Sequence, residues 1–207
     1  MSRMTLIAAV SAAALFGVAG CNKPATTAAN DNATTTTPMT STNSSMASTA
    51  NDNVQDNIKK AQEFVDNAGQ AGLAEIQTSK IALERSTNPD VKAFAQQMID
   101  DHTKANEALK AAANAAALAP PSDVLDDFHM RRVNDLTEDK PGDANFDADY
   151  MHLQVDAHND AVKLFKDYAD DGKIAQIKSF AAATLPTLEA HQTKAKSVND
   201  MVKSSES

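Results

Sequence analysis

The main pattern of the chain, from Val54 onward, is a stripe of apolar side chains that recurs every 3.6 residues, as in amphipathic helices. It predicts four long helices, over about 54–85, 89–117, 143–171 and 173–202. Asn88, Pro89 and Asp90 mark the start of the second helix. Asn caps free N–H groups, Pro suits the first helical position, and Asp complements the positive end of the helix dipole. Gly172 is predicted to end the third helix in the left-handed conformation.

The connection between the second and third helices is much longer than the other two. Two prolines, Pro120 and Pro121, end the second helix, and a further short helix is predicted over about 122–134. This connector is long enough to run the length of a helix of roughly 40 Å. We therefore predict an all-α, ferritin-like four-helix bundle over 54–204, in which two helical hairpins are joined by a long crossover. A plain up-down-up-down bundle, whose long loop folds back, also fits the pattern.

The beginning of the chain predicts an export signal. Arg3 is followed by a short apolar stretch from Leu6 to Val18, which is too short to span a bilayer as a helix. We expect residues 1–20 to be removed. The sequence Val-Ala-Gly before Cys21 resembles the lipobox of bacterial lipoproteins. That resemblance implies a lipid on Cys21 as the membrane anchor, and Asn22 after it implies an outer membrane, with the domain facing the periplasm.

Two features of composition limit the remaining choices. Residues 21–53 are rich in Ser, Thr and Asn and have almost no large apolar side chains, so we expect a disordered tether. The net charge of −9, without a basic cluster, argues against nucleic-acid binding. Cys21 is the single cysteine, so no disulfide can form within the chain.

Each predicted long helix turns one Glu or His toward its apolar side. These residues are Glu75, His102, His158 and His191, whereas His152 falls among charged residues. In the crossover topology the four lie within roughly 9 Å of one another along the bundle axis. They are therefore predicted to share one polar layer.

Two interpretations of this layer remain open. The four residues suit a single transition-metal ion (Zn, Fe, Mn or Cu), with Asp101, Asp147 and Tyr150 as possible supports behind the ligands. The Glu-x-x-His pairs of di-iron bundles do not occur on inward faces, so a two-metal centre is not expected. Alternatively, the same residues form a buried hydrogen-bond network that fixes the helix register. No catalytic residue is predicted.

Three segments resemble the bacterial domain of unknown function 4142 family: FAQQMIDDHTKAN (94–106), FDADYMHLQVDAHNDAVKLF (146–165) and IKSFAAATLPTLEAH (177–191). The resemblance covers about 65–203 and includes Glu75, Asp101, His102, Asp147, Tyr150, His158 and His191. It implies a ferritin-like fold and an exported protein. It implies no activity, because the family has no agreed one.

The leading hypothesis is a non-catalytic cell-envelope lipoprotein, a soluble bundle held at the membrane by the lipid on Cys21. Its inner Glu and His residues are structural or bind a metal ion. The alternatives are a ferritin-like metalloenzyme that handles oxidants or metal at the envelope, and a helical scaffold for another envelope protein. The sequence does not indicate which protein that partner would be.

Overall fold

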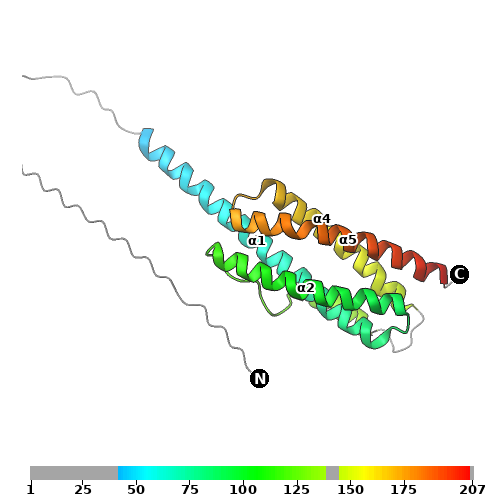
Figure 1. Cartoon of the computed structure of the whole chain (residues 1–207). Helices are drawn as coiled ribbons and strands as arrows, with labels where there is room; N and C mark the ends of the chain where they lie inside the picture. The colour runs from blue at the N-terminus through cyan, green and yellow to red at the C-terminus, as the bar shows by residue number, and fades with distance from the viewer. Residues whose placement is uncertain (1–41, 139–144, 206–207) are drawn as a thin grey trace, which may run out of the picture. The chain divides into compact units, whose positions relative to one another are not determined.

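The computed structural model describes residues 42–138 and 145–205, and within them the chain is all-helical (Figure 1). The elements are α1 (Thr42–Arg85), α2 (Pro89–Ala115), α3 (Asp127–Glu138), α4 (Phe146–Asp171) and α5 (Ala175–Ser205). The prediction of an all-α fold with four long helices and a short one in the connector is confirmed. None of the described helices combines the length and apolar character needed to cross a membrane.

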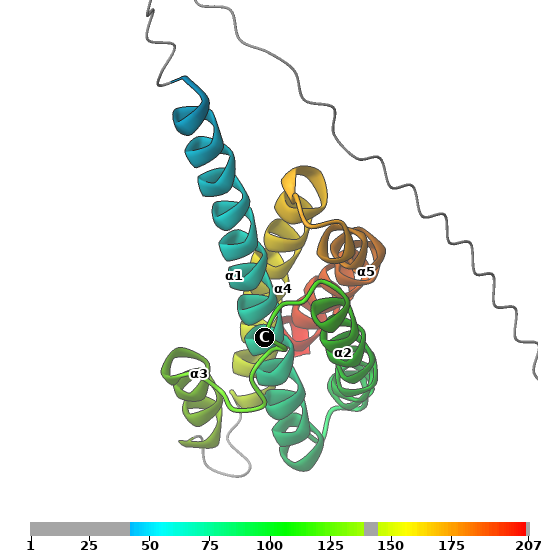
Figure 2. The same ribbon diagram turned by 90° about the vertical axis from the view of Figure 1, so that its left-hand side faces the viewer.

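The long helices form two antiparallel hairpins that pack side by side. α1 pairs with α2, and α4 pairs with α5. The hairpins meet where α2 packs on α5 and α1 on α4. The short helix α3 lies against the outside of α1, as the turned view shows (Figure 2).

The described part of the connection from α2 to α4, up to Glu138, follows α1 and is held to it by three side chains. The amide of Gln62 bonds both backbone groups of Ala119, with Nε2···O at 3.2 Å and N···Oε1 at 2.9 Å. Gln70 donates to the carbonyl of Val124 at 3.0 Å and accepts from the N–H of Asp126 at 2.8 Å. The third side chain, Arg85, donates to the carbonyls at the end of α3, those of Leu136 and Thr137, at 2.8 Å each. From Gln62 to Arg85 the helix rises by roughly 35 Å, so the connection crosses the length of the bundle.

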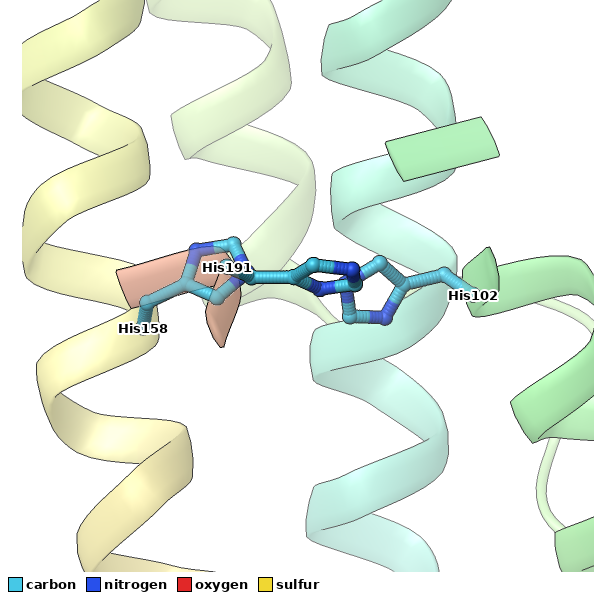
Figure 3. Close-up of side chains that lie close together, drawn as sticks. All are labelled: His102, His158 and His191. Atoms are coloured by element: carbon cyan, nitrogen blue, oxygen red, sulfur yellow. The ribbon is translucent and has the colours of Figure 1, made fainter. Parts of the chain in front are cut away.

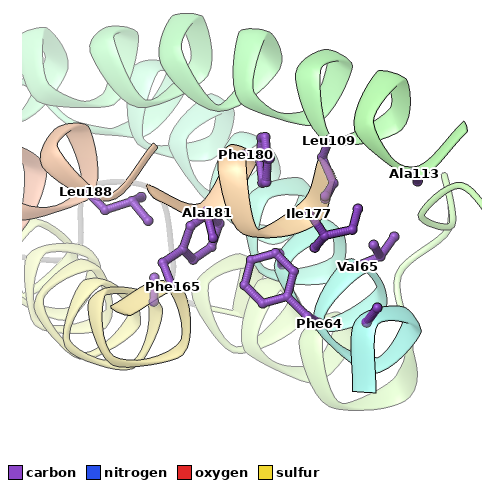
Figure 4. Close-up of a cluster of buried hydrophobic side chains, with 12 residues drawn as sticks. Phe64, Val65, Leu109, Ala113, Phe165, Ile177, Phe180, Ala181 and Leu188 are labelled. Atoms are coloured by element: carbon purple, nitrogen blue, oxygen red, sulfur yellow. The ribbon is translucent and has the colours of Figure 1, made fainter. Parts of the chain in front are cut away.

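Two apolar clusters fill the interior on either side of a polar layer. The first contains Phe64, Phe165 and Phe180, whose ring centroids lie 5.0–6.4 Å apart (Figure 4). The second is built around Phe94 and Tyr150, with centroids 6.4 Å apart. On every long helix, the predicted site residue falls between the stretches that supply the two clusters.

The caps of the helices test the local predictions. The Asn88 side chain accepts from the N–H groups of Asp90 at 2.9 Å and Val91 at 3.5 Å, which confirms the predicted N-cap. The prediction for Gly172 is wrong, because its φ of −54° and ψ of 139° are extended and not left-handed. Glycine is needed there for space: a Cβ would lie 2.4 Å from Cε1 of Tyr168.

The start of the first helix also differs from the prediction. α1 begins at Thr42, within the predicted tether, and not near Val54. Val54 and Ile58 are 53% and 38% exposed. Because little of this end of α1 packs against other helices, its sequence carries no clear apolar stripe from which the start of the helix could be predicted. The predicted signal peptide, Cys21 and the tether up to residue 41 lie outside the described residues.

Candidate metal centre

The polar layer between the two apolar clusters holds Glu75 of α1, His102 of α2, His158 of α4 and His191 of α5. All four are buried, with exposed fractions of 4%, 6%, 0% and 1%. The three imidazoles turn toward one another from three helices (Figure 3), and their ring centroids lie 5.4–5.7 Å apart. One potential ligand nitrogen from each ring lies within 4.8 Å of the other two.

Helical spacing places these side chains in the interior. His102 follows Met98 by one turn, and His191 follows Leu188 and precedes Ala195 in the same way. His158 lies one turn after Gln154 and shares its buried face with Ala161 and Phe165. Residues three or four apart share a helix face, so burial of these apolar neighbours carries the histidines inward.

Glu75 lies at the edge of two of the rings. Its Oε2 is 2.5 Å from Nε2 of His102 and 3.5 Å from Nε2 of His158. Even at these distances, none of the three atoms meets a partner with the angles of a hydrogen bond. Glu75 is therefore close enough to His102 for an ion pair, and Nε2 of His158 lies near the same carboxylate oxygen.

Two of the histidines use one ring nitrogen each in a hydrogen bond to the surrounding protein. Nδ1–H of His158 donates to the backbone carbonyl of Gln154 at 2.9 Å, and Nε2–H of His191 donates to Oδ2 of Asp101 at 3.1 Å. These bonds fix the ring orientations and leave lone pairs on Nε2 of His158 and Nδ1 of His191. Both of these nitrogens are buried and lack a hydrogen-bond partner among the described residues.

The charges in the layer depend on one another. Burial alone would raise the pKa of Glu75, but the charges of His102 and His158 outweigh it and lower that pKa to about 2. Burial opposes charge on His102 as well, yet the Glu75 carboxylate raises the His102 pKa above its usual 6.5. For His191, burial and the neighbouring His102 charge lower the pKa. These shifts favour the charged forms of Glu75 and His102 and the neutral form of His191.

The three imidazoles could hold a transition-metal ion, and the Glu75 carboxylate lies beside two of them. Imidazole nitrogens and a carboxylate oxygen are ligands for Zn, Cu, Fe and Mn. A tetrahedral ion with bonds of about 2.0–2.1 Å needs its ligand atoms about 3.4 Å apart. The three imidazoles, whose nitrogens lie within 4.8 Å of one another, would move closer together, and the Glu75 carboxylate, now 2.5 Å from Nε2 of His102, would move away from that ring. A carboxylate or carbonyl behind the outer nitrogen is the usual partner of a metal-bound histidine, and Asp101 and the Gln154 carbonyl occupy these positions.

The three predicted supporting residues differ in where they lie. Asp101 lies directly behind His191. Tyr150 bonds Ser79, one turn along α1 from Glu75, with 2.9 Å between the two oxygens. Asp147 is about three turns of α4 before His158, roughly 16 Å along the helix axis, and so is outside the cluster.

Sequence reasoning missed Gln154 as a part of this layer. Its carbonyl orients His158, and its side-chain Nε2 donates to Oγ1 of Thr78 at 3.3 Å. The available signal was its position one turn before His158 on the inward face of α4. That spacing alone does not show which polar atoms meet.

Comparisons with known proteins agree with the helical architecture. The model of a family described as "Domain of unknown function (DUF4142)" matches residues 43–198, which include all four residues of the layer. Among solved structures, the chain is similar to "Crystal structure of DUF305 fragment from Deinococcus radiodurans". The identity is 15% and the TM-score 0.58, with 69% of this chain and 96% of that chain covered. At this identity the likeness shows a shared fold alone. No curated protein matches the chain.

Proposed function

We propose that this chain, which belongs to the DUF4142 family, binds one divalent transition-metal ion in the middle of its bundle. The ligands are Glu75 and the three inward histidines. One observation carries the proposal: three buried imidazoles each bring a ring nitrogen within 4.8 Å of the other two, and Nε2 of His158 and Nδ1 of His191 are buried without a hydrogen-bond partner among the described residues. Leaving such atoms unpaired costs about 1–3 kcal/mol each, which an ion would offset. A closed hydrogen-bond network would have paired them.

Four protein ligands favour zinc in a closed site. Structural zinc sites have four protein ligands in a tetrahedron, whereas catalytic ones keep a position open for water or substrate. Glu75, His102, His158 and His191 would complete such a tetrahedron. This supports a bundle that uses its ion for stability or carries it, in agreement with the hypothesis of a non-catalytic protein.

The proposed location is the cell envelope. The export signal and Cys21 support a lipid anchor, and Asn22 supports the outer membrane with the bundle on its periplasmic side. We also assign the bundle to the ferritin-like class. This assignment is supported by the two hairpins and by the connection that runs along α1 between them.

Metal analysis of protein purified without a chelator or an affinity tag tests this function. We expect a stoichiometric ion, and a rise in Tm when Zn²⁺ is added to the metal-free protein, because a ligand of the native state stabilises it. The His158→Ala variant should lose both effects. His152→Ala is the matched control, since His152 lies exposed on the same helix. Metal-free protein whose Tm does not respond to Zn, Cu, Fe or Mn would refute the proposal.

A further inference from the structure

A separate pocket, which we call the side pocket, opens between α1, α3 and α4 and has a volume of about 260 Å³. Its walls are mostly apolar, but polar residues surround its mouth. Asn67 and Asp160 are exposed there, and a third polar residue, His129, is held by Asp126 with Nδ1···Oδ1 at 2.8 Å. Buried Glu75 also lies in the lining, so the side pocket extends from the surface to the edge of the polar layer.

A second and much smaller space lies deeper in the bundle, among α1, α2, α4 and α5. This inner cavity, of about 20 Å³, has both Glu75 and His102 in its lining. The side pocket and the inner cavity have three lining residues in common, Ala71, Glu75 and Ala161. These three residues form the partition between the two spaces. Two of them are alanines, whose side chains have no rotamers, so Glu75 is the one that can turn aside.

The Glu75 side chain contacts both sides of this partition. Its Oε2 is buried beside His102, yet 5% of the side chain remains accessible. The polar neighbours of Glu75 in the wall are fixed: the Thr78 hydroxyl donates to the Ala74 carbonyl at 3.0 Å, and Gln154 donates to that hydroxyl at 3.3 Å. Gln154 is fully buried, so it supports the wall and does not face the side pocket. Glu75 can therefore turn while its neighbours stay in place.

The sizes of the two spaces determine in which form an ion could occupy each. A divalent ion with six waters, at about 30 Å³ per water, occupies roughly 180 Å³ and would fit the side pocket but not the inner cavity. Two carboxylates lie near the mouth, that of Asp160 in the lining and that of Asp126 beside His129. They face one guanidinium, that of Arg132, which lies 5.7 Å from the Phe128 ring. A hydrated cation can thus enter as far as the partition, where it must lose water.

The inner cavity has a second possible exit, between α1 and α2. Asn106 borders both the inner cavity and a surface pocket of about 150 Å³. A Cβ on Gly72 would lie only 2.5 Å from Oδ1 of Asn106, so the amide packs directly on the backbone of α1. This contact closes the second exit and favours the route through the side pocket.

We propose that the side pocket is the route by which the divalent ion reaches the histidines, and that Glu75 is the gate of this route. The inference rests on the metal site proposed above. The Glu75 carboxylate turns toward the side pocket, replaces a water on the incoming ion, and turns back toward His102. Release follows the same steps in reverse. An obstruction in the side pocket therefore slows uptake and release by the same factor and leaves the affinity unchanged, because it alters the barrier and not the end states.

Zinc kinetics on the full chain test this route. Uptake by metal-free protein from a zinc-binding dye gives the association rate, and release to excess chelator gives the dissociation rate. Ala157→Leu narrows the side pocket, so both rates should fall about tenfold at an unchanged Kd. Loss of the neighbouring ligand in His158→Ala should instead weaken the Kd itself. Ala182→Leu, at an exposed alanine of α5, should change neither rate.

A second obstruction and the rival exit complete the test. Leu153→Trp, which fills the side pocket from another position, should also slow both rates and keeps the test valid if Ala157→Leu does not fold. Zinc binding whose rates neither variant slows would overturn the route and leave the metal site standing. Slower rates in Asn106→Leu alone would place the route between α1 and α2 and would also overturn it. A chain that binds no zinc at equilibrium would refute the metal site, and the route with it.

Discussion

At the scale of single residues, the contrast between His152 and His158 carries the main lesson. Both lie on α4, yet His158 is fully buried and His152 is exposed. Their positions relative to the apolar stripe differ, and the helical period alone decides which one can meet side chains from other helices. The position of a histidine in the helical period therefore decides whether it can take part in the buried polar layer.

The Glu75–His102 pair predicts how stability depends on pH in the metal-free protein. The Glu75 pKa is about 2 in the fold against an ordinary 4.5, so its contribution is present above pH 4.5 and is lost as the pH falls toward 2. The His102 pKa is raised above 6.5, so its contribution is complete below pH 6.5 and is lost as the pH rises through the raised value. The pair should stabilise most between pH 4.5 and 6.5.

Thermal unfolding with chelator present, from about pH 3 to about pH 9, measures this dependence. The difference in Tm between the wild-type chain and His102→Gln should be largest inside the window and shrink on both sides. His129→Gln, on α3 away from the layer, serves as the control. A difference that is independent of pH would show that the pair does not carry these charges.

Asp101 predicts an effect through His191. Asp101→Asn keeps an acceptor for the His191 ring but removes the charge that makes the ring a better ligand, so zinc affinity should fall about 10-fold or more. Competition with a zinc-binding dye measures the affinity. The neighbouring variant Asp100→Asn should match the wild type, because Asp100 bonds Gln96 on the surface. An unchanged affinity in Asp101→Asn would remove Asp101 from the account.

The positions of Glu75 and the histidines could be predicted, whereas their contacts could not. The helical period gives the direction of each side chain, and the number of residues from the nearest turn gives its position along the bundle axis. Asp147 shares an arc with His158 but lies too far along the helix, and Gln154 acts partly through its backbone carbonyl. Such features depend on side-chain rotamers and on helix packing, and the hydrophobic period of the sequence predicts neither.

At the scale of elements, helix ends separate what a sequence shows from what it hides. The Asn88 cap is encoded by side-chain chemistry and was predictable. The end of α2 is different: Ala117 has φ of 56°, and Leu118 N–H bonds the carbonyl of Ala113 at 2.9 Å. A glycine would be expected at such a position, and alanine gives no signal for it.

This end of α2 predicts a stabilising substitution. Ala117→Gly should raise the free energy of unfolding by about 0.5–1 kcal/mol, because relief of the left-handed strain exceeds the entropy gained by the unfolded chain. Urea denaturation with an unchanged m-value measures it. Ala115→Gly, in the last turn of the same helix, should destabilise by up to about 1 kcal/mol. A loss of stability in Ala117→Gly would contradict the strain at this residue.

At the scale of the whole molecule, the crossover joins the two hairpins, and the proposed lipid on Cys21 would hold the bundle at a membrane. The crossover was predictable from its length and its two prolines, but its attachment to α1 through Gln62, Gln70 and Arg85 was not. Amide side chains on a helix surface usually face solvent, and their use as clamps depends on which loop passes over them.

The anchor predicts the fate of a Cys21→Ser variant. Without the thiol no lipid can be attached, so the precursor should remain unprocessed and leave the lipoprotein fraction on detergent partitioning. The variant Asn30→Ser, in the same segment, should fractionate like the wild type. Cys21→Ser protein that still fractionates with lipoproteins would show that the anchor assignment is wrong.

X-ray absorption of the zinc-loaded protein tests the central claim most directly, because it reports the atoms around the ion. The account predicts four nitrogen or oxygen ligands at about 2.0–2.1 Å, with the outer scattering of three imidazoles. His158→Ala should lose one of these imidazoles, and His152→Ala should lose none. A spectrum without imidazole scattering, or a protein that retains no zinc, would contradict it.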